Sequence, residues 1–302
     1  MANQDYYNKL LANKYTDYIV KKETTLLEFL MTYIPGNSRT KAKKLLSMKM
    51  VYVDKVITTQ FDAILKPGQI VQIAHKGNPH DLRNKFVQIV YEDAFIIVVN
   101  KESGIVSVPM PGTREVSVKS ILNEYVKRRN RTASVHTVHR LDRGTSGMMM
   151  FAKKRDIQQT LIENWKQIIT ERKYVAVVEG KIEKDKGIVT SWLSDDKRYV
   201  IFSSPVNNGG KYAVTNYTTL KRSAEFSLVE LILQTGRTNQ IRVHMKELGH
   251  PVVGDEKYGN KSKITDRLCL HAKSLGFYHP VTNELLQFNS EIPDLFKKIL
   301  KY

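Results

Sequence analysis

Six short apolar runs, all after residue 85, limit the architectures open to this chain. They are FVQIVY, FIIVVNK, GMMMFAK, KYVAVVEG, AVTNYTTL and FSLVELILQ. Apolar runs of this length, separated by polar and glycine residues, are typical of β-strands. Apolar residues at helical spacing predict helices over 116–129, 154–169, 238–248 and 292–301. Because the strands come in clusters and do not alternate strictly with helices, the sequence predicts an α+β fold with a mixed, mainly antiparallel sheet.

A smaller segment with its own pattern precedes these runs. An apolar stripe over 26–34 predicts one helix, and Ser38 is suited to cap the start of a second. Short strands are expected at 50–54 and 68–74. The predicted organisation is a small α/β domain over 18–75, a linker over 76–85 and a larger domain over 86–302.

The second of these helices is basic on its polar side. It carries Arg39, Lys41, Lys43 and Lys44 without an acidic residue between them. A charged run is most often a solvated face, but this one lacks the Glu–Lys pairs that a merely soluble helix uses. The whole chain also has 48 Lys and Arg against 30 Asp and Glu, a net charge of +18. This positive excess indicates a polyanionic partner, either nucleic acid or an anionic membrane surface.

Several classes of protein are disfavoured by what the sequence contains. The helix after Ser38 has no aromatic residue to insert into a lipid surface, so nucleic acid is the preferred partner. No apolar run approaches the ~20 residues of a membrane helix. Cys269 is the only cysteine, so neither an intrachain disulfide nor a zinc site of cysteine pairs can form. We expect a cytoplasmic protein that binds nucleic acid and has no membrane partner.

The highest density of chemically active residues is VHRLDRGTSGMMMFAK, over 138–153. Asp142 lies between Arg140 and Arg143, just before an apolar strand. A carboxylate close to guanidinium groups is expected to stay ionised. Such a group suits a nucleophile or an ion pair that caps the strand, and the residues alone leave both alternatives open.

A second concentration is LQTGRTNQIRVHMKELGHPVVGDEKYG, over 233–259. Apolar positions in 238–248 form one helical face, and Arg242 lies on the other side. Thr238 is expected to cap the start of this helix and Gly249 to end it. Arg242 is thus placed either to reach a carboxylate or phosphate outside the helix, or to remain a surface arginine. No P-loop, dinucleotide-binding, nucleophile-elbow or zinc-protease motif occurs, so no cofactor and no metal are expected.

HRLDRGTSG resembles the signature HRLD-x-x-TSG of the RluA-type pseudouridine synthases. Four further segments are similar to motifs of that family and follow in the same order. They are VVNKESGIVSVP, ERKYVAVVEG, TGRTNQIRVHMKELGHPVVGDEKYG and RLCLHAKSLGFYHPVTNE. The resemblance covers about residues 86–290 and implies a catalytic domain with flanking helices and a central cleft.

The resemblance implies an enzyme that isomerises uridine to pseudouridine in ribosomal or transfer RNA. It implies that Asp142 is the catalytic carboxylate, that Arg242 pairs with it, and that Tyr174 packs against the target base. Arg140 would fill the space left by a flipped base. Neither a cofactor nor an obligate protein partner is implied, and we expect a monomer. The alternative is a catalytically weak, synthase-like RNA-binding factor in ribosome assembly.

Two positions depart from the family pattern. Glu102 stands where the family usually has proline, and Asn239 stands where it usually has histidine. We expect Asn239 to affect the contacts to RNA or the hydrogen bonding that orients Arg242.

The small N-terminal segment resembles the S-four RNA-binding domain, over TLLEFLMTYIPGNSRTKAKKLLSMKMVYVDKVI and LKPGQIVQI. Arg39, Lys41, Lys43 and Lys44 would then contact RNA. Such domains usually have an Asn-Gly pair in the first hairpin, where this chain has Val53-Asp54-Lys55.

Overall fold

The computed structural model describes residues 15–301, except 35, 49, 55, 75–81, 83, 111, 129, 196–199, 261 and 263. The chain divides into two compact units. The first consists of the described residues before Asn84 together with Tyr91–Ala94, and the second of Asn84–Val90 with the described residues from Phe95 onward. Most of the predicted linker over 76–85 lies outside the described residues, so the boundaries 18–75 and 86–302 stay predictions. No helix in the described ranges is long and apolar enough to cross a membrane.

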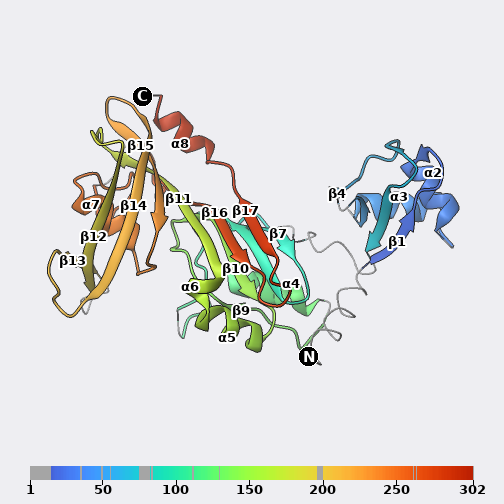
Figure 1. Cartoon of the computed structure of the whole chain (residues 1–302), viewed down its shortest axis with the longest axis horizontal. Helices are drawn as coiled ribbons and strands as arrows, with labels where there is room; N and C mark the ends of the chain where they lie inside the picture. Colours follow the sequence, from blue (N-terminus) through green and yellow to red (C-terminus); the bar gives the residue numbers. More distant parts are fainter. Residues whose placement is uncertain are drawn as a thin grey trace. The chain divides into compact units, whose positions relative to one another are not determined.

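The first unit combines two helices with two small antiparallel sheets (Figure 1). Its core contains apolar residues from both helices and from the strands, among them Leu26, Leu30, Leu46 and Val71. The helices are α2 (Leu26–Tyr33) and α3 (Arg39–Ser47). One sheet has the order β1 (Tyr15–Ile19), β6 (Ile70–Ala74), β3 (Val51–Val53) and β4 (Val56–Ile57), and the other pairs β2 (Thr24–Thr25) with β5 (Ile64–Leu65).

Helix α3 starts as its sequence predicts. The Ser38 hydroxyl accepts a hydrogen bond from the Lys41 backbone N–H at 3.3 Å, which satisfies one of the free donors of the first turn. Ala42 and Leu46 are buried, whereas the four basic residues named above are exposed. The amphipathic character of α3 therefore leaves its whole basic side open to solvent.

The hairpin between β3 and β4 shows how this chain forms the turn without an Asn-Gly pair. Asp54 has a φ of 48°, in the left-handed region that Asp tolerates better than most residues. Its carboxylate accepts from the Ile70 backbone N–H and from the Gln69 amide, at 2.9 and 2.8 Å. Lys55 lies outside the described residues.

The second unit is built on one eleven-stranded sheet. Its order is β13-β12-β14-β15-β11-β16-β10-β8-β7, with β17 beside β16 and β9 beside β10. Among the described strand pairs of this sheet only β10 and β16 are parallel, so the predicted mixed, mainly antiparallel sheet is confirmed. The strands are β7 (Val87–Glu92), β8 (Ile96–Lys101), β9 (His136–Thr137), β10 (Ser146–Ala152), β11 (Ile169–Glu179), β12 (Lys186–Asp195), β13 (Ile201–Ser204), β14 (Lys211–Arg222), β15 (Phe226–Leu233), β16 (Leu270–Tyr278) and β17 (Leu285–Asn289).

Among the described residues of this unit, five helices accompany the sheet, all within the four predicted ranges and with shorter bounds; the helix predicted over 154–169 is two helices, which meet at Asn164. The five helices are α4 (Val118–Lys127), α5 (Arg155–Glu163), α6 (Trp165–Ile168), α7 (Gln240–Glu247) and α8 (Asp294–Ile299). Figure 1 shows α7 beside β12–β14, α5 beside β9 and β10, and α6 beside β11. The parallel pair β10–β16 depends on Gly147, where a Cβ would come 2.1 Å from the Ala272 carbonyl oxygen. With a φ of +113° as well, this position admits only glycine.

Helix α7 begins differently from the prediction. The residue before its first turn is Asn239, not Thr238, and its φ of 53° places it in the left-handed region. The Asn239 side chain makes no capping bond because its amide is used elsewhere, as described below. The predicted end is confirmed, since Gly249 has a φ of +85° and its N–H donates to the Lys246 carbonyl at 2.9 Å.

His244 is a buried histidine on α7, and its burial makes a testable difference to stability. Its ring bonds to Ser191 and Thr215 hydroxyls at 3.0 and 2.8 Å, and burial lowers its pKa from 6.5 to about 4. Between these values the unfolded chain holds a proton that the native protein lacks, so the free energy of unfolding falls as the pH falls. We expect this group to contribute up to about 3 kcal/mol of that loss by pH 4.

The matching variant is His244→Gln, which keeps hydrogen-bonding capacity without a titrating group. Urea unfolding of both proteins at pH 7, 6, 5 and 4.5 should show a flatter pH dependence for the variant. Parallel pH profiles for the two proteins would contradict this role of His244.

Candidate active site

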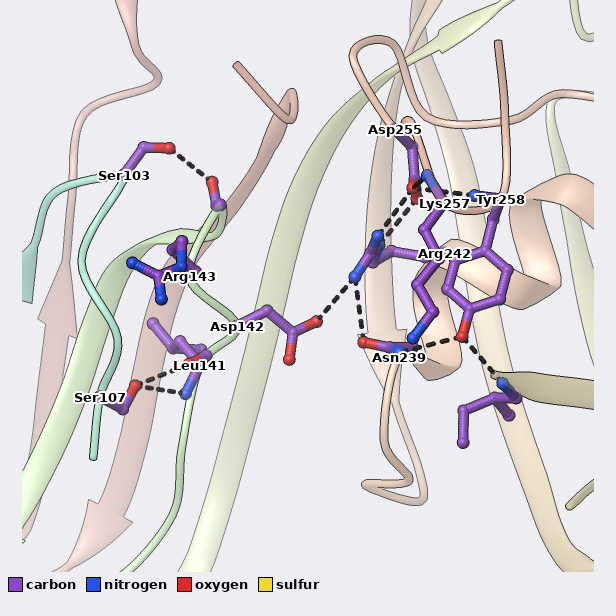
Figure 2. Close-up of polar contacts among 12 residues, drawn as sticks. Ser103, Ser107, Leu141, Asp142, Arg143, Asn239, Arg242, Asp255, Lys257 and Tyr258 are labelled. Atoms are coloured by element: carbon purple, nitrogen blue, oxygen red, sulfur yellow. Dashed lines mark hydrogen bonds and ion pairs between the residues drawn. The ribbon is translucent and has the colours of Figure 1, made fainter. Parts of the chain in front are cut away.

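Asp142 lies in the loop between β9 and β10, and the backbone around it is tied down by residues 101–107. Ser107 donates its hydroxyl proton to the Leu141 carbonyl at 2.6 Å and accepts from the Leu141 N–H at 3.0 Å. Ser103 donates to the Gly144 carbonyl at 2.8 Å. These bonds hold the chain on both sides of Asp142, so its carboxylate is presented by a fixed loop (Figure 2).

Lys101, at the end of β8, also holds this loop, through three hydrogen bonds. Its ammonium group is fully buried and donates to the backbone carbonyls of Glu102, Arg143 and Thr145 at 2.9, 3.2 and 2.7 Å. Burial lowers the pKa of Lys101 to about 8, an effect that the negative charge of Asp142 opposes. At neutral pH, Lys101 therefore acts as a buried cation that positions the Asp142 loop.

Arg242 comes from α7 and faces Asp142 across the site. Its Nη1 lies 3.5 Å from Asp142 Oδ2. Its Nε and Nη2 donate to the two carboxylate oxygens of Asp255, each at 2.7 Å, in a bidentate pair that sequence reasoning missed. The Asp255 side chain is fully buried. Figure 2 shows the resulting line of Asp142, Arg242 and Asp255.

These distances rank the two carboxylates. Asp255 is the close partner that neutralises Arg242, while Asp142 has only a long ion pair with it and is 28% exposed on its side chain. The carboxylate of Asp142 is thus oriented by Arg242 and remains accessible to a ligand. In the sequence, Asp255 stands inside the motif segment over 233–259, directly after Gly254, which has a φ of +76° in the structure.

Asn239 extends the network to the sheet. Its side-chain oxygen accepts from Arg242 Nη1 at 3.1 Å, and its amide donates to the Tyr258 hydroxyl at 3.0 Å. The same hydroxyl accepts from the Ile201 backbone N–H at 3.0 Å. Asn239 therefore fixes the Nη1 that faces Asp142, which agrees with the expectation that this residue affects the bonding of Arg242.

The other family departure, Glu102, is explained by the backbone. Its N–H donates to the Phe86 carbonyl at 2.8 Å, a bond that proline would lack. Its side chain is exposed.

A cavity of about 530 Å³ joins three of the predicted site residues, Asp142, Arg242 and Tyr174. Tyr174 is on β11, is 7% exposed, and pairs across the sheet with Leu231. Arg140 also lines the cavity and is exposed. Arg143, the other sequence neighbour of Asp142, points elsewhere and forms an ion pair with Glu115. The cation that faces Asp142 is therefore Arg242, 100 positions later in the chain, while one flanking arginine has its own acidic partner.

The four basic residues of α3 belong to the first unit and do not line this cavity. Among the residues that the structure describes, no three His, Cys, Asp or Glu side chains come together in a way that could hold a metal ion.

Comparisons with known proteins agree on one family. Residues 95–247 match the family model described as RNA pseudouridylate synthase. An uncharacterized RNA pseudouridine synthase of Aquifex aeolicus is 34% identical, with 93% of this chain and 94% of that protein covered. The ribosomal large subunit pseudouridine synthase D of Buchnera aphidicola is also 34% identical, with 95% of each covered. Among solved structures, human RNA Pseudouridylate Synthase Domain Containing 4 has a TM-score of 0.58 at 22% identity, over 70% of this chain and 91% of that one, a likeness of fold.

Proposed function

This chain belongs to the RNA pseudouridylate synthase family, and we propose that it isomerises uridine in structured ribosomal RNA with Asp142 as the catalytic carboxylate. The observation that carries the proposal is the placement of Asp142. It lines the same cavity as Tyr174 and faces Arg242, whose charge is already matched by Asp255. The ribosomal substrate is supported by the name of the Buchnera aphidicola relative.

The reaction is an isomerisation whose atoms balance without a co-reactant. The bond from C1′ of the ribose to N1 of uracil breaks, the base turns, and a bond from C1′ to C5 forms. The C5 proton is lost to solvent and N1 gains one. Asp142 would serve as an ionised nucleophile toward the ribose or the base, or would assist departure of the base.

Tyr174 and Arg140 would both contact the RNA, Tyr174 at the target base and Arg140 where the base has left the helix. Tyr174 offers an aromatic face for the target base, buried in the wall of the cavity. A base stacked in a helix does not reach such a cavity, so the target uridine would be flipped into it or lie in a loop. Arg140 is exposed at the edge and would occupy the position that the base leaves.

Tritium release tests the function directly. Large-subunit ribosomal RNA, transcribed with uridine labelled at C5, is incubated with the native protein, and tritium in water is counted. Release in proportion to pseudouridine found by nuclease digestion supports the proposal. Salt-sensitive binding of the RNA without release would instead identify an RNA-binding factor.

We propose that the first unit is an S-four-like RNA-binding domain and that α3 is its contact surface. Four exposed cations lie on this helix, and none has a carboxylate within ion-pair distance among the described residues. Contacts of this kind would add affinity without sequence choice.

The variant Lys43→Gln/Lys44→Gln tests this surface. Each lost phosphate contact lowers the slope of log affinity against log salt by about 1, so we expect a decrease of about 2. The turnover number at saturating RNA should stay unchanged. The matched control is Lys21→Gln/Lys22→Gln, two exposed lysines outside α3. Equal slopes for the two double variants would show that α3 has no special role.

A further inference from the structure

Arg172 is one of the charged residues of the cavity wall that the proposed reaction does not use. It lies on β11 two residues before Tyr174, so the two side chains share one face of the strand. The Arg172 Nη2 donates to the Tyr174 hydroxyl at 3.4 Å. Both residues line the same cavity as Asp142. Arg172 is therefore close to where a target base would meet Tyr174.

The guanidinium group of Arg172 has two close neighbours, Trp165 and Gly236. Its Cζ lies 5.6 Å from the centroid of the Trp165 ring, in cation–π contact. A Cβ at Gly236 would come 2.8 Å from Arg172 Nη1, so the absence of a side chain lets the loop pass this close to the guanidinium group. Trp165 itself packs on His139, with ring centroids 5.3 Å apart. The head group is preorganised, and a ligand would pay little entropy to immobilise it.

Arg172 has no counter-ion among the described residues. Glu171, its neighbour on β11, pairs with Lys173 at 2.8 Å, and both acidic partners at the centre of the site belong to Arg242. A partly buried guanidinium without a carboxylate is unfavourable unless a ligand supplies the negative charge. An anion that enters the cavity would supply the charge that Arg172 lacks among the described residues.

We propose that Arg172, in contact with Trp165 and close to Gly236, binds a phosphodiester group adjoining the target uridine. The inference rests on the proposed function. Uracil and ribose carry no charge, so phosphate is the anion that RNA brings to this cavity. The edge of a guanidinium fits two phosphate oxygens at once, which a lysine ammonium does not reproduce. Tyr174 on the base and Arg172 on the phosphate would fix the flipped nucleotide at two points.

The experiment measures kcat/KM for tritium release as a function of salt, for the full-length native protein, Arg172→Gln and Arg172→Lys. The probe is large-subunit ribosomal RNA transcribed in vitro, because productive turnover reports only complexes in which the cavity is filled. We expect Arg172→Gln to lower kcat/KM about tenfold at low salt, through KM, and to reduce the salt slope by about 1. Arg172→Lys should restore the slope but only part of the affinity. The control is Arg128→Gln, an exposed arginine that pairs with Glu124 and does not line the cavity.

The outcomes separate this inference from the proposed function. If the native protein releases no tritium, both the inference and the proposed function are contradicted. Suppose that the native protein is active and that Arg172→Gln lowers kcat without changing the salt slope. This result would overturn the phosphate contact and would mean that Arg172 acts by positioning Tyr174. Equal slope changes in Arg172→Gln and Arg128→Gln would also overturn it, because the effect would then be one of overall charge.

Discussion

Asp142→Asn should abolish tritium release, with a fall in turnover of at least about 10⁴-fold. Asparagine has nearly the same shape and still offers an oxygen toward Arg242 Nη1, which lies 3.5 Å from the native carboxylate. It cannot act as an anionic nucleophile. The loss therefore isolates the chemical role of the carboxylate from its place in the structure.

Binding and stability provide the controls for this variant. The Asp142–Arg242 pair is long and partly exposed, so its removal should change the free energy of unfolding by no more than about 1 kcal/mol. Affinity for RNA should be retained or increased, because one negative charge facing the phosphates is lost. Retained turnover in Asp142→Asn would reject the assignment of Asp142. Loss of both turnover and folding would mean that the residue acts structurally.

The sequence predicted most of the secondary structure for reasons that are local. The helices follow from apolar spacing, and the start of α3 follows from a serine that can cap it. At α7 the same reasoning placed the start one residue early, because it assigned the cap to Thr238. The Asn239 amide does not cap the helix but links Arg242 to Tyr258. The Asn239 side chain is used in the network around Arg242, which the local capping pattern does not predict.

The site was less accessible to sequence reasoning because its contacts are long-range. The pairing of β10 with β16 places Ser146 opposite His271, and the spacing of apolar residues in the sequence does not predict such a parallel contact. Asp255 lies in an irregular loop, where burial and pairing leave no repeating signal. The three catalytic candidates came from motif resemblance, as did the interest in Asn239. The structure adds the bonds of Asn239 to Arg242 and Tyr258, and the supporting groups Lys101, Ser107 and Asp255.

Asp255→Asn is expected to have the second-largest effect. Asp255 is fully buried and accepts from Arg242 Nε and Nη2, and also from the backbone N–H groups of Lys257 and Tyr258 at 3.1 Å each. An amide at this position removes the charge that neutralises Arg242. Breaking one side of a buried pair typically costs about 3–5 kcal/mol, so the melting temperature should fall markedly.

Turnover should fall with it, by about 100-fold or more, for a second reason. With Asp255 neutral, the free charge of Arg242 is available to Asp142, and the long pair between them would tighten. The Asp142 carboxylate would then be held in a closer ion pair and turned from the substrate. RNA affinity should not decrease, since the site becomes one unit more positive. The fall in turnover is measured below the melting transition, so that loss of folded protein does not imitate it.

The matched control is Glu247→Gln, the same acid-to-amide change on α7. Glu247 is exposed and accepts from the Ser203 hydroxyl at 2.6 Å, away from Arg242. We expect this variant to keep native turnover and to unfold within about 0.5 kcal/mol of the native protein. If Asp255→Asn lost stability but kept native turnover, Arg242 would not need its buried partner to orient Asp142. Asp255 would then contribute to folding alone.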